Sequence, residues 1–202
     1  MEEARDRVQR LRGSGWRGLW CLLMLGMSVA FWQGLARAES SAGGAWILVD
    51  TKAHTLSVFG GDRLLARFDN IAIGRGGFSL DRMRDDGATP LGTFHIDRIN
   101  AKSRFRLFFG IDYPRPEHAR RAFEEGRIDA EDYRRIVDAF QRREPPPQDT
   151  PLGGQLGIHG LGAGDPRIHQ VVNWTQGCIA LTNEQISRLS RWIHVGMRVE
   201  VR

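Results

Sequence analysis

The sequence predicts a single domain that is mainly β with added helices, and three observations support this fold class. In residues 46–73, short runs alternate apolar and polar side chains between glycine and aspartate turns, which is typical of strands buried on one face. Two later stretches, within 130–143 and 183–193, carry apolar residues at helical spacing. About 164 residues follow an N-terminal leader, a length that suits one domain with a substantial core.

The predicted sheet begins as a meander of short strands. Residues 81–87 carry so many charges that they are expected to stay outside the core. A turn through Pro90 and Gly92 then leads into another strand, and His95 within that strand is interpreted as structural. The strands of the meander are expected at 46–49, 55–59 and 64–68, with 71–73 continuing the sheet.

A helical insertion is predicted at about 113–149. Residues 130–143 form an amphipathic helix in this prediction, because Tyr133, Ile136 and other apolar residues recur at helical spacing. Asp129 is placed to cap the start of this helix, and the proline run at 145–147 ends it.

The last quarter of the chain returns to strands and one helix. His159 follows an apolar run and precedes a glycine, so its imidazole is expected at the end of a strand. Thr182 or Asn183 caps the next helix, and Gln185 is placed for a capping box. Residues 197–201 alternate and are expected to form the closing strand.

The N-terminus has the pattern of a secretory signal peptide. Five arginines precede an uncharged, mostly apolar run at 19–32, and Ala36-Arg37-Ala38 follows it. We therefore expect residues 1–38 to be a signal, cleaved after Ala38, and the protein to be exported to the periplasm or cell envelope. The apolar run is short of the roughly 20 residues that span a bilayer. An uncleaved N-terminal anchor is the alternative, and it is the only membrane contact that we expect.

Removal of the leader leaves one cysteine. Cys21 lies within the leader, and Cys178 is the single cysteine of residues 39–202. A lone cysteine in an exported protein cannot form an internal disulfide, so Cys178 is either a buried, inert side chain or a reactive thiol.

Charge and histidine spacing argue against two other classes of protein. The leader holds six of the 29 basic and three of the 24 acidic side chains, so residues 39–202 carry a net charge of only +2. There is no basic stripe with interleaved aromatic residues, and we expect no nucleic-acid partner. The six histidines are scattered without the spacing of a zinc site, so no metal or cofactor is expected. Composition leaves the oligomeric state open.

Three motifs follow one another along the chain: Thr89–Phe94 (TPLGTF), His159-Gly160 and Thr175–Ile179 (TQGCI). In this order they resemble the signatures of the L,D-transpeptidase catalytic domain family of YkuD type. Cys178 lies 19 positions after His159, a spacing that fits the family pattern. The resemblance covers essentially all of residues 39–202. It implies a β-sandwich-like catalytic domain, peptidoglycan stem peptides as the substrate and a cysteine nucleophile.

The residues agree with the chemistry that such a reaction needs. A thiol is a good nucleophile only as the thiolate, so a neighbouring base assists it, and His159 is the candidate general base and acid. The attacked carbonyl needs hydrogen-bond donors for its developing negative charge, and the backbone N–H groups of Gly177 and Cys178 are the candidates.

The chain departs from the family pattern at two positions. Gln176 stands where a histidine is usual, and it can form hydrogen bonds but cannot titrate. Ala180 stands where an arginine is frequent, which removes the usual contact to a substrate carboxylate, and Arg167 is a candidate replacement. The remaining candidate supporting or substrate-binding residues are Gly160, His169, Trp174 and Thr175.

The leading hypothesis is L,D-transpeptidation through a Cys178 thioester, with release of terminal D-alanine and transfer of the acyl group to an amine. The same acyl-enzyme attacked by water would make an L,D-carboxypeptidase or an amidase, and the sequence does not separate these reactions. The loss of histidine at position 176 keeps a third hypothesis open, a non-catalytic peptidoglycan-binding relic. The insertion at 113–149 is expected to wall or cover the active site.

Overall fold

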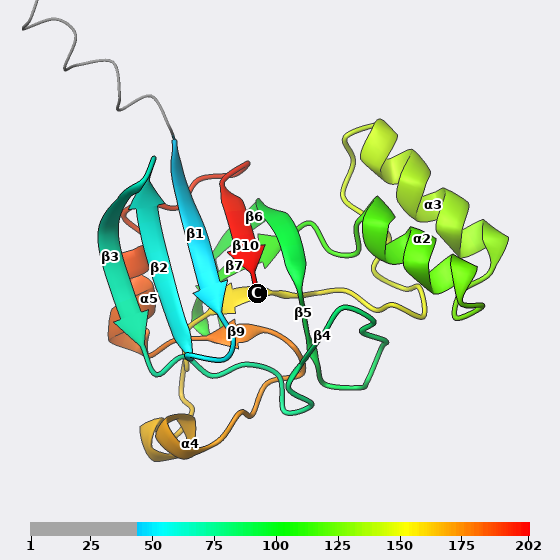
Figure 1. Ribbon diagram of the computed structural model, residues 1–202. Helices are drawn as coiled ribbons and strands as arrows, with labels where there is room; N and C mark the ends of the chain where they lie inside the picture. Colours follow the sequence, from blue (N-terminus) through cyan, green and yellow to red (C-terminus); the bar gives the residue numbers. More distant parts are fainter. Residues whose placement is uncertain (1–43) are drawn as a thin grey trace, which may run out of the picture. The chain divides into compact units, whose positions relative to one another are not determined.

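An eight-stranded mixed sheet is the framework of the protein (Figure 1). The structure is a computed structural model and describes residues 44–202, so the predicted signal peptide lies outside the described residues. The strand order is β3-β2-β1-β10-β6-β7-β8-β9, and a separate two-stranded ladder joins β4 and β5. The strands are β1 (Ala45–Asp50), β2 (Thr55–Gly60), β3 (Arg63–Asp69), β4 (Phe78–Ser79), β5 (Thr89–Pro90), β6 (Gly92–Ser103), β7 (Arg106–Ile111), β8 (Gly157–His159), β9 (Ile179–Ala180) and β10 (Arg198–Val201).

The two ends of the sheet approach each other. Neighbouring strands are antiparallel except for the parallel pairs β1–β10 and β8–β9. Ala72, just after β3, pairs with Ala180 of the opposite edge strand β9, and each backbone N–H donates to the other residue's carbonyl, at 3.0 and 2.8 Å. The short strand β9 is therefore held on both sides although it ends the sheet.

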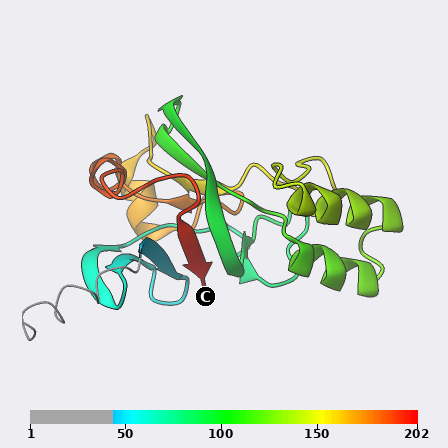
Figure 2. The ribbon, with the colours of Figure 1, turned by 90° about the horizontal axis from the view of Figure 1, so that it is seen from above.

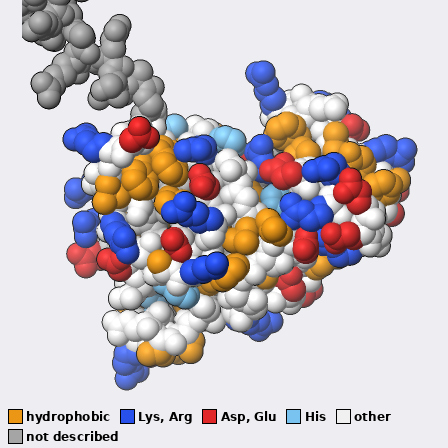
Figure 3. Space-filling model, in the orientation of Figure 1, with side chains coloured by type: hydrophobic (Ala, Val, Ile, Leu, Met, Phe, Trp, Pro, Cys, Tyr) orange, Lys and Arg blue, Asp and Glu red, His pale blue; other side chains and the backbone are white. Residues whose placement is uncertain are grey.

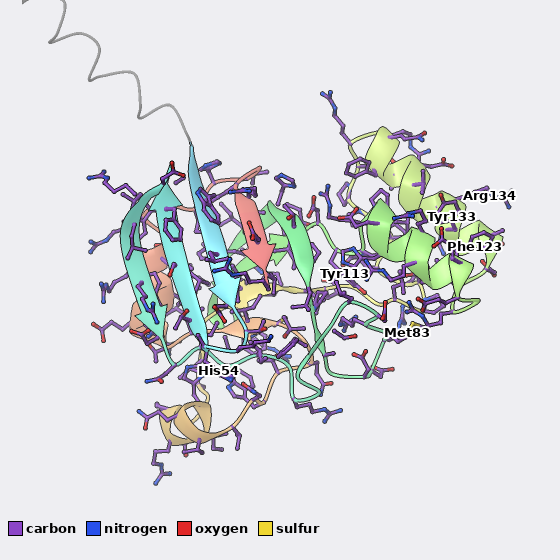
Figure 4. The ribbon with its side chains drawn as sticks, in the orientation of Figure 1. His54, Met83, Tyr113, Phe123, Tyr133 and Arg134 are labelled. Atoms are coloured by element: carbon purple, nitrogen blue, oxygen red, sulfur yellow. The ribbon has the colours of Figure 1, made fainter. Side chains whose placement is uncertain are left out.

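Residues 44–202 contain four helices, and two of them form a pair to one side of the sheet (Figures 1 and 2). Phe123 of the first helix in this pair stacks on Tyr133 of the second, with ring centroids 5.2 Å apart (Figure 4). The capping predictions are confirmed: Asp129 accepts from the N–H groups of Glu131 and Asp132, and Thr182 forms a capping box with Gln185. The helices are α2 (Pro116–Glu124), α3 (Ala130–Gln141), α4 (Pro166–Val171) and α5 (Asn183–Leu189).

One hydrophobic core lies between the two halves of the curved sheet. The twelve-residue strand β6 pairs with β10 through its first half and with β7 through its second, so both halves share it. Fully buried side chains come from strands of both halves and from α5: Ile47, Val49, Phe94, Ile96, Phe109, Ile111, Ile158, Ile179 and Ile186. The prediction of a mainly β domain with added helices is confirmed.

A glutamine side chain joins the two ends of the helical segment. The Gln148 amide nitrogen donates to the carbonyls of Tyr113, at 3.0 Å, and Pro146, at 2.8 Å. The Gln148 side-chain oxygen accepts from the backbone N–H of Gln155. The chain leaves the sheet at 113 and returns toward it at 148, and the Gln148 side chain therefore holds both points together.

The structure also corrects the expected elements. Residues 71–73 form only an isolated bridge, and α2 was not predicted. The last quarter of the chain holds two helices, α4 and α5, where one was expected. Within the charged segment 81–87, Arg82 is buried at 5% exposure, contrary to the expectation that this segment stays outside the core.

In the face shown by Figure 3, positive and negative side chains are interspersed, and hydrophobic ones gather over β1 to β3 and over α2 and α3.

Candidate active site

Cys178 and His159 lie on neighbouring parallel strands. Cys178 immediately precedes β9, and His159 ends β8. The register pairs His159 with Ala180, two residues after Cys178, so both side chains belong to the same face of the β8–β9 pair. The structure thus places the two residues that sequence analysis singled out at the ends of neighbouring strands, on one face of the pair.

The turn before the thiol is fixed by Thr175. Its hydroxyl donates to the carbonyl of Cys178 at 2.6 Å and accepts the N–H of Gly177 at 3.1 Å. Gly177 has a φ of +116°, and a Cβ there would lie 2.5 Å from the Ala88 carbonyl oxygen. Position 177 therefore requires glycine.

Of the two backbone donors expected to stabilise an oxyanion, one is already engaged. The Gly177 N–H donates to Thr175, as described above. Within residues 44–202 we find no hydrogen-bond partner for the N–H of Cys178. The Cys178 N–H is thus the free donor at this turn, and Gly177 contributes through its conformation.

We expect Thr175→Val to weaken both the fold and the reaction. Valine keeps the shape but leaves the buried Gly177 N–H and the Cys178 carbonyl without partners, which costs about 2 kcal/mol and lowers Tm by about 6 °C. We expect kcat to fall about tenfold, because the free N–H of Cys178 is no longer held in place. Thr175→Ser, which keeps the hydroxyl, should retain most of both properties, and a valine variant with unchanged Tm would contradict this account.

The thiol of Cys178 is protonated at rest. Cys178 is half-buried, and its Sγ lies 3.7 Å from the carbonyl oxygen of Gln155, to which the S–H donates. Burial raises the pKa of the thiol to about 11, although a hydrogen bond from the Gly157 backbone and the charges of Arg82 and Arg98 act in the opposite direction.

The imidazole of His159 is held as a neutral base. Its Nδ1 lies 2.6 Å from the Gly160 carbonyl oxygen, which can only accept, so Nδ1 carries the proton and Nε2 offers a lone pair. Burial is the main cause that lowers the pKa of His159, and the positive charge of Arg104 acts in the same direction. At rest the two groups are a thiol and a neutral imidazole, so an attack by the sulfur would require transfer of the thiol proton.

These pKa shifts predict a specific pH dependence for alkylation of Cys178. Because the pKa is raised to about 11, the thiolate fraction is small at pH 7 and grows about tenfold per pH unit until that pKa is reached. We expect slow alkylation by iodoacetamide at pH 7, with a rate that rises up to about pH 11. Rates measured from pH 6 to 12 on folded and urea-unfolded protein test this. A midpoint near the ordinary thiol value in the folded protein would contradict it.

Aromatic side chains frame the imidazole. Phe105 and Phe108 stack on His159, with ring centroids 4.2 and 6.2 Å away, and Trp174 meets it edge to face at 5.8 Å. The Trp174 indole N–H donates to Nδ1 of His169 at 3.3 Å. Trp174 therefore contacts both His159 and His169. Sequence analysis did not single out the two phenylalanines of the β6–β7 hairpin.

The remaining predicted residues take different positions. Gly160 is buried, and a Cβ there would lie 2.7 Å from the Phe105 carbonyl oxygen. Gln176 is exposed beside Cys178, and its backbone carbonyl is held by Arg82. The Arg167 side chain is 90% exposed and is paired with Asp165 at 2.9 Å, in a solvated ion pair on α4. The structure does not bring Arg167 into contact with the residues around the thiol.

Arg82 is a site residue that sequence analysis missed. Its guanidinium donates to the carbonyls of Ala88 at 2.8 Å, Leu152 at 2.6 Å and Gln176 at 3.3 Å. It also lies over the ring of Tyr113, 5.4 Å from the centroid, where the chain leaves the sheet toward α2 and α3 (Figure 4). One buried cation thus joins three segments around the Gly177–Cys178 turn.

A small cavity opens at the thiol. Its volume is about 290 Å³, and Cys178 and Arg82 are among its lining residues. Gln148, at the end of the helical segment, also lines this cavity, so the segment contributes to the wall beside the thiol. Within residues 44–202, no three His, Cys, Asp or Glu side chains gather into a possible metal site, and no helix is long and apolar enough to cross a membrane.

Comparisons with known proteins agree with this arrangement. The family profile of the L,D-transpeptidase catalytic domain (YkuD) matches residues 44–201. The fold is similar to the helical cell shape determining protein Pgp2 from Campylobacter jejuni, with 18% identity, a TM-score of 0.54 and coverage of 86% of this chain and 54% of that one. Bd1075 from Bdellovibrio bacteriovorus is similar at 18% identity and a TM-score of 0.50, over 81% of this chain and 50% of that one.

The chain thus spans about half the length of these two structures. A comparison with curated protein sequences found no match. The profile match nevertheless extends over nearly all of the described residues and includes both the thiol and the imidazole, so the chain belongs to the L,D-transpeptidase (YkuD) catalytic domain family.

Proposed function

We propose that the protein is a cysteine acyltransferase that cleaves a stem peptide of peptidoglycan and transfers the acyl group to an amine. Its family acts on peptidoglycan, which implies a location in the cell envelope. The observation that supports catalysis most directly is that Cys178 and His159 share one face of the β8–β9 pair, with the tautomer of His159 fixed by the Gly160 carbonyl.

In the first half-reaction, Nε2 of His159 takes the thiol proton as Sγ attacks the carbonyl of the third stem residue. The C–S bond forms, and the N–H of Cys178 donates to the oxyanion. The C–N bond to the terminal D-alanine then breaks, and His159 returns the proton to the leaving amine. The products are a Cys178 thioester and free D-alanine.

In the second half-reaction, an acceptor amine attacks the thioester carbonyl. His159 takes a proton from the amine and returns it to sulfur, so the new amide is released and the thiol is restored. Water in place of the amine would give an L,D-carboxypeptidase, and attack on a stem that carries a protein would give an amidase. The wall that Gln148 and Gln155 form beside Cys178 controls which acceptor reaches the thioester.

The test is intact-mass analysis of the protein with a tetrapeptide muropeptide, with and without an added amine. We expect a transient mass increase equal to the acyl group, located at Cys178 by peptide mapping, together with release of D-alanine. A cross-linked product that needs the amine identifies transfer, and a tripeptide product that is independent of the amine identifies hydrolysis. Absence of both an adduct and D-alanine would reject the proposal in favour of a peptidoglycan-binding relic.

A further inference from the structure

The β6–β7 hairpin, which contacts His159 through Phe105 and Phe108, contains a group of basic side chains. The hairpin extends from the sheet (Figure 2), and residues 98–106 contain four basic side chains and no acidic one. Two of the four have polar partners: Arg98 pairs with Asp97 at 2.9 Å, and Arg106 donates to the Ser187 hydroxyl at 2.7 Å. The four basic residues are Arg98, Lys102, Arg104 and Arg106.

Arg104 is linked to the imidazole of His159 through the ring of Phe105. Its guanidinium carbon lies 4.8 Å from the centroid of the Phe105 ring, and the His159 ring lies 4.2 Å from the same centroid. The two distances together place the guanidinium within about 9 Å of the imidazole. A residue of extended peptide spans roughly 3.3–3.6 Å, so the distance from this cation to the imidazole corresponds to at most about two to three residues of a bound peptide.

The guanidinium of Arg104 has free hydrogen-bond donors and a restricted conformation, both of which favour ligand binding. Arg104 is exposed, and within residues 44–202 we find neither an ion pair nor a hydrogen bond for its side chain. Stacking on the Phe105 ring limits the side-chain conformations, so less freedom is lost when the guanidinium binds. A planar guanidinium with free donors matches a carboxylate, which it can bind through two parallel hydrogen bonds.

Arg98 lies on the thiol side of the same hairpin. Its guanidinium lies over Phe108, 5.3 Å from the ring centroid, and donates to the Gln155 side-chain oxygen at 3.1 Å. The carbonyl of Gln155 is the group that accepts the hydrogen bond from the Cys178 thiol. Two arginines on two phenylalanines thus flank the site, one toward His159 and one toward Cys178, and Arg98 is already engaged by Asp97 and Gln155.

We propose that Arg104 binds a free carboxylate of the stem peptide and takes the place of the arginine that the family frequently has two residues after the cysteine. This assignment rests on the proposed function. It replaces Arg167, whose guanidinium is paired with Asp165 in solvent. Arg104 determines specificity: it favours peptides with a carboxylate close to the scissile bond over peptides in which that carboxylate is amidated.

The test compares Arg104→Gln with Lys102→Gln, which removes the same charge two residues away at the exposed hairpin tip. On a tetrapeptide with free carboxylates, we expect Arg104→Gln to lower kcat/KM about tenfold, mainly through KM, and Lys102→Gln to change it less than twofold. On the carboxamide analogue of the tetrapeptide, wild type and Arg104→Gln should react equally. Equal losses in the two variants, or an equal loss on both peptides, would overturn the proposal.

Binding measurements separate this proposal from the proposed function. In a Cys178→Ala background, which cannot turn over, fluorescence anisotropy of a labelled tetrapeptide gives Kd directly. We expect Arg104→Gln to raise Kd about tenfold for the free-carboxylate peptide and to leave it unchanged for the carboxamide. Such binding without turnover in the wild type would reject the acyltransferase and keep the carboxylate site. Turnover in the wild type, together with a Kd that Arg104→Gln does not change, would keep the acyltransferase and reject the carboxylate site.

Discussion

Replacing Cys178 with alanine is expected to abolish the acyl adduct and to lower turnover of stem peptides by at least about a thousandfold. Alanine has no nucleophile, so the thioester cannot form, and the binding groups that remain cannot replace it. Cys178 is half-buried beside the core, so we expect a loss of only about 1 kcal/mol in the free energy of unfolding. The measurements are release of D-alanine, intact mass and Tm on the same preparation.

Two companion variants make this result interpretable. Cys178→Ser keeps the shape but has a much weaker nucleophile, and we expect no more than trace activity from it. His159→Gln keeps a hydrogen-bonding side chain without a base, and we expect a loss of at least about a hundredfold. If Cys178→Ala kept a tenth of the wild-type turnover with the native Tm, the thiol would not be the nucleophile.

The second large effect is expected at Arg82. Arg82→Met removes the donors to the carbonyls of Ala88, Leu152 and Gln176 from a site that is 5% exposed. Loss of one partner in a buried polar network costs about 3–5 kcal/mol, so we expect Tm to fall by about 10 °C or more. Because the charge of Arg82 lowers the pKa of the Cys178 thiol, its removal should also slow alkylation at every pH below 11.

Arg84 supplies the matched control for Arg82. It also donates to backbone carbonyls, those of Thr150 and Gln148, but it is exposed. We expect Arg84→Met to cost about 1 kcal/mol and to leave the alkylation rate unchanged. Arg82→Lys keeps the charge without the fork of donors, so it should restore alkylation more than Tm. Equal effects of Arg82→Met and Arg84→Met would show that the buried position of Arg82 has no special role.

Local patterns predicted the parts of the structure that depend on local interactions. Alternation located the strands of the meander, and the caps at Asp129 and Thr182 are contacts between residues two or three positions apart. Helix α2 was missed because its buried face consists of Ala119, Ala122 and His118, which give little apolar periodicity. The β6–β7 hairpin was missed because charged residues at its tip interrupt the alternation, and its pairing contains irregularities.

The candidate site likewise contains features that local sequence predicts and features that only the fold determines. The motifs around His159 and Cys178 identified the nucleophile and the base, since these depend on residue type and on order in the chain. They did not show which N–H of the turn is free, because that depends on the hydroxyl of Thr175. Arg82 was beyond prediction because an arginine in a charged loop is usually solvated, and only the fold supplies the three carbonyls that accept from it.

The contacts of Gln148 have a consequence for how this domain diversifies. The Gln148 side chain bonds to the carbonyls of Tyr113 and Pro146 and to the N–H of Gln155, so the chain on either side of the α2–α3 pair is held independently of the helices. We expect that helices of other lengths or sequences can be exchanged between these points while the Gln155 carbonyl stays at the thiol. Selectivity for different cell-wall polymers could then evolve in one exchangeable module without a change in the chemistry at sulfur.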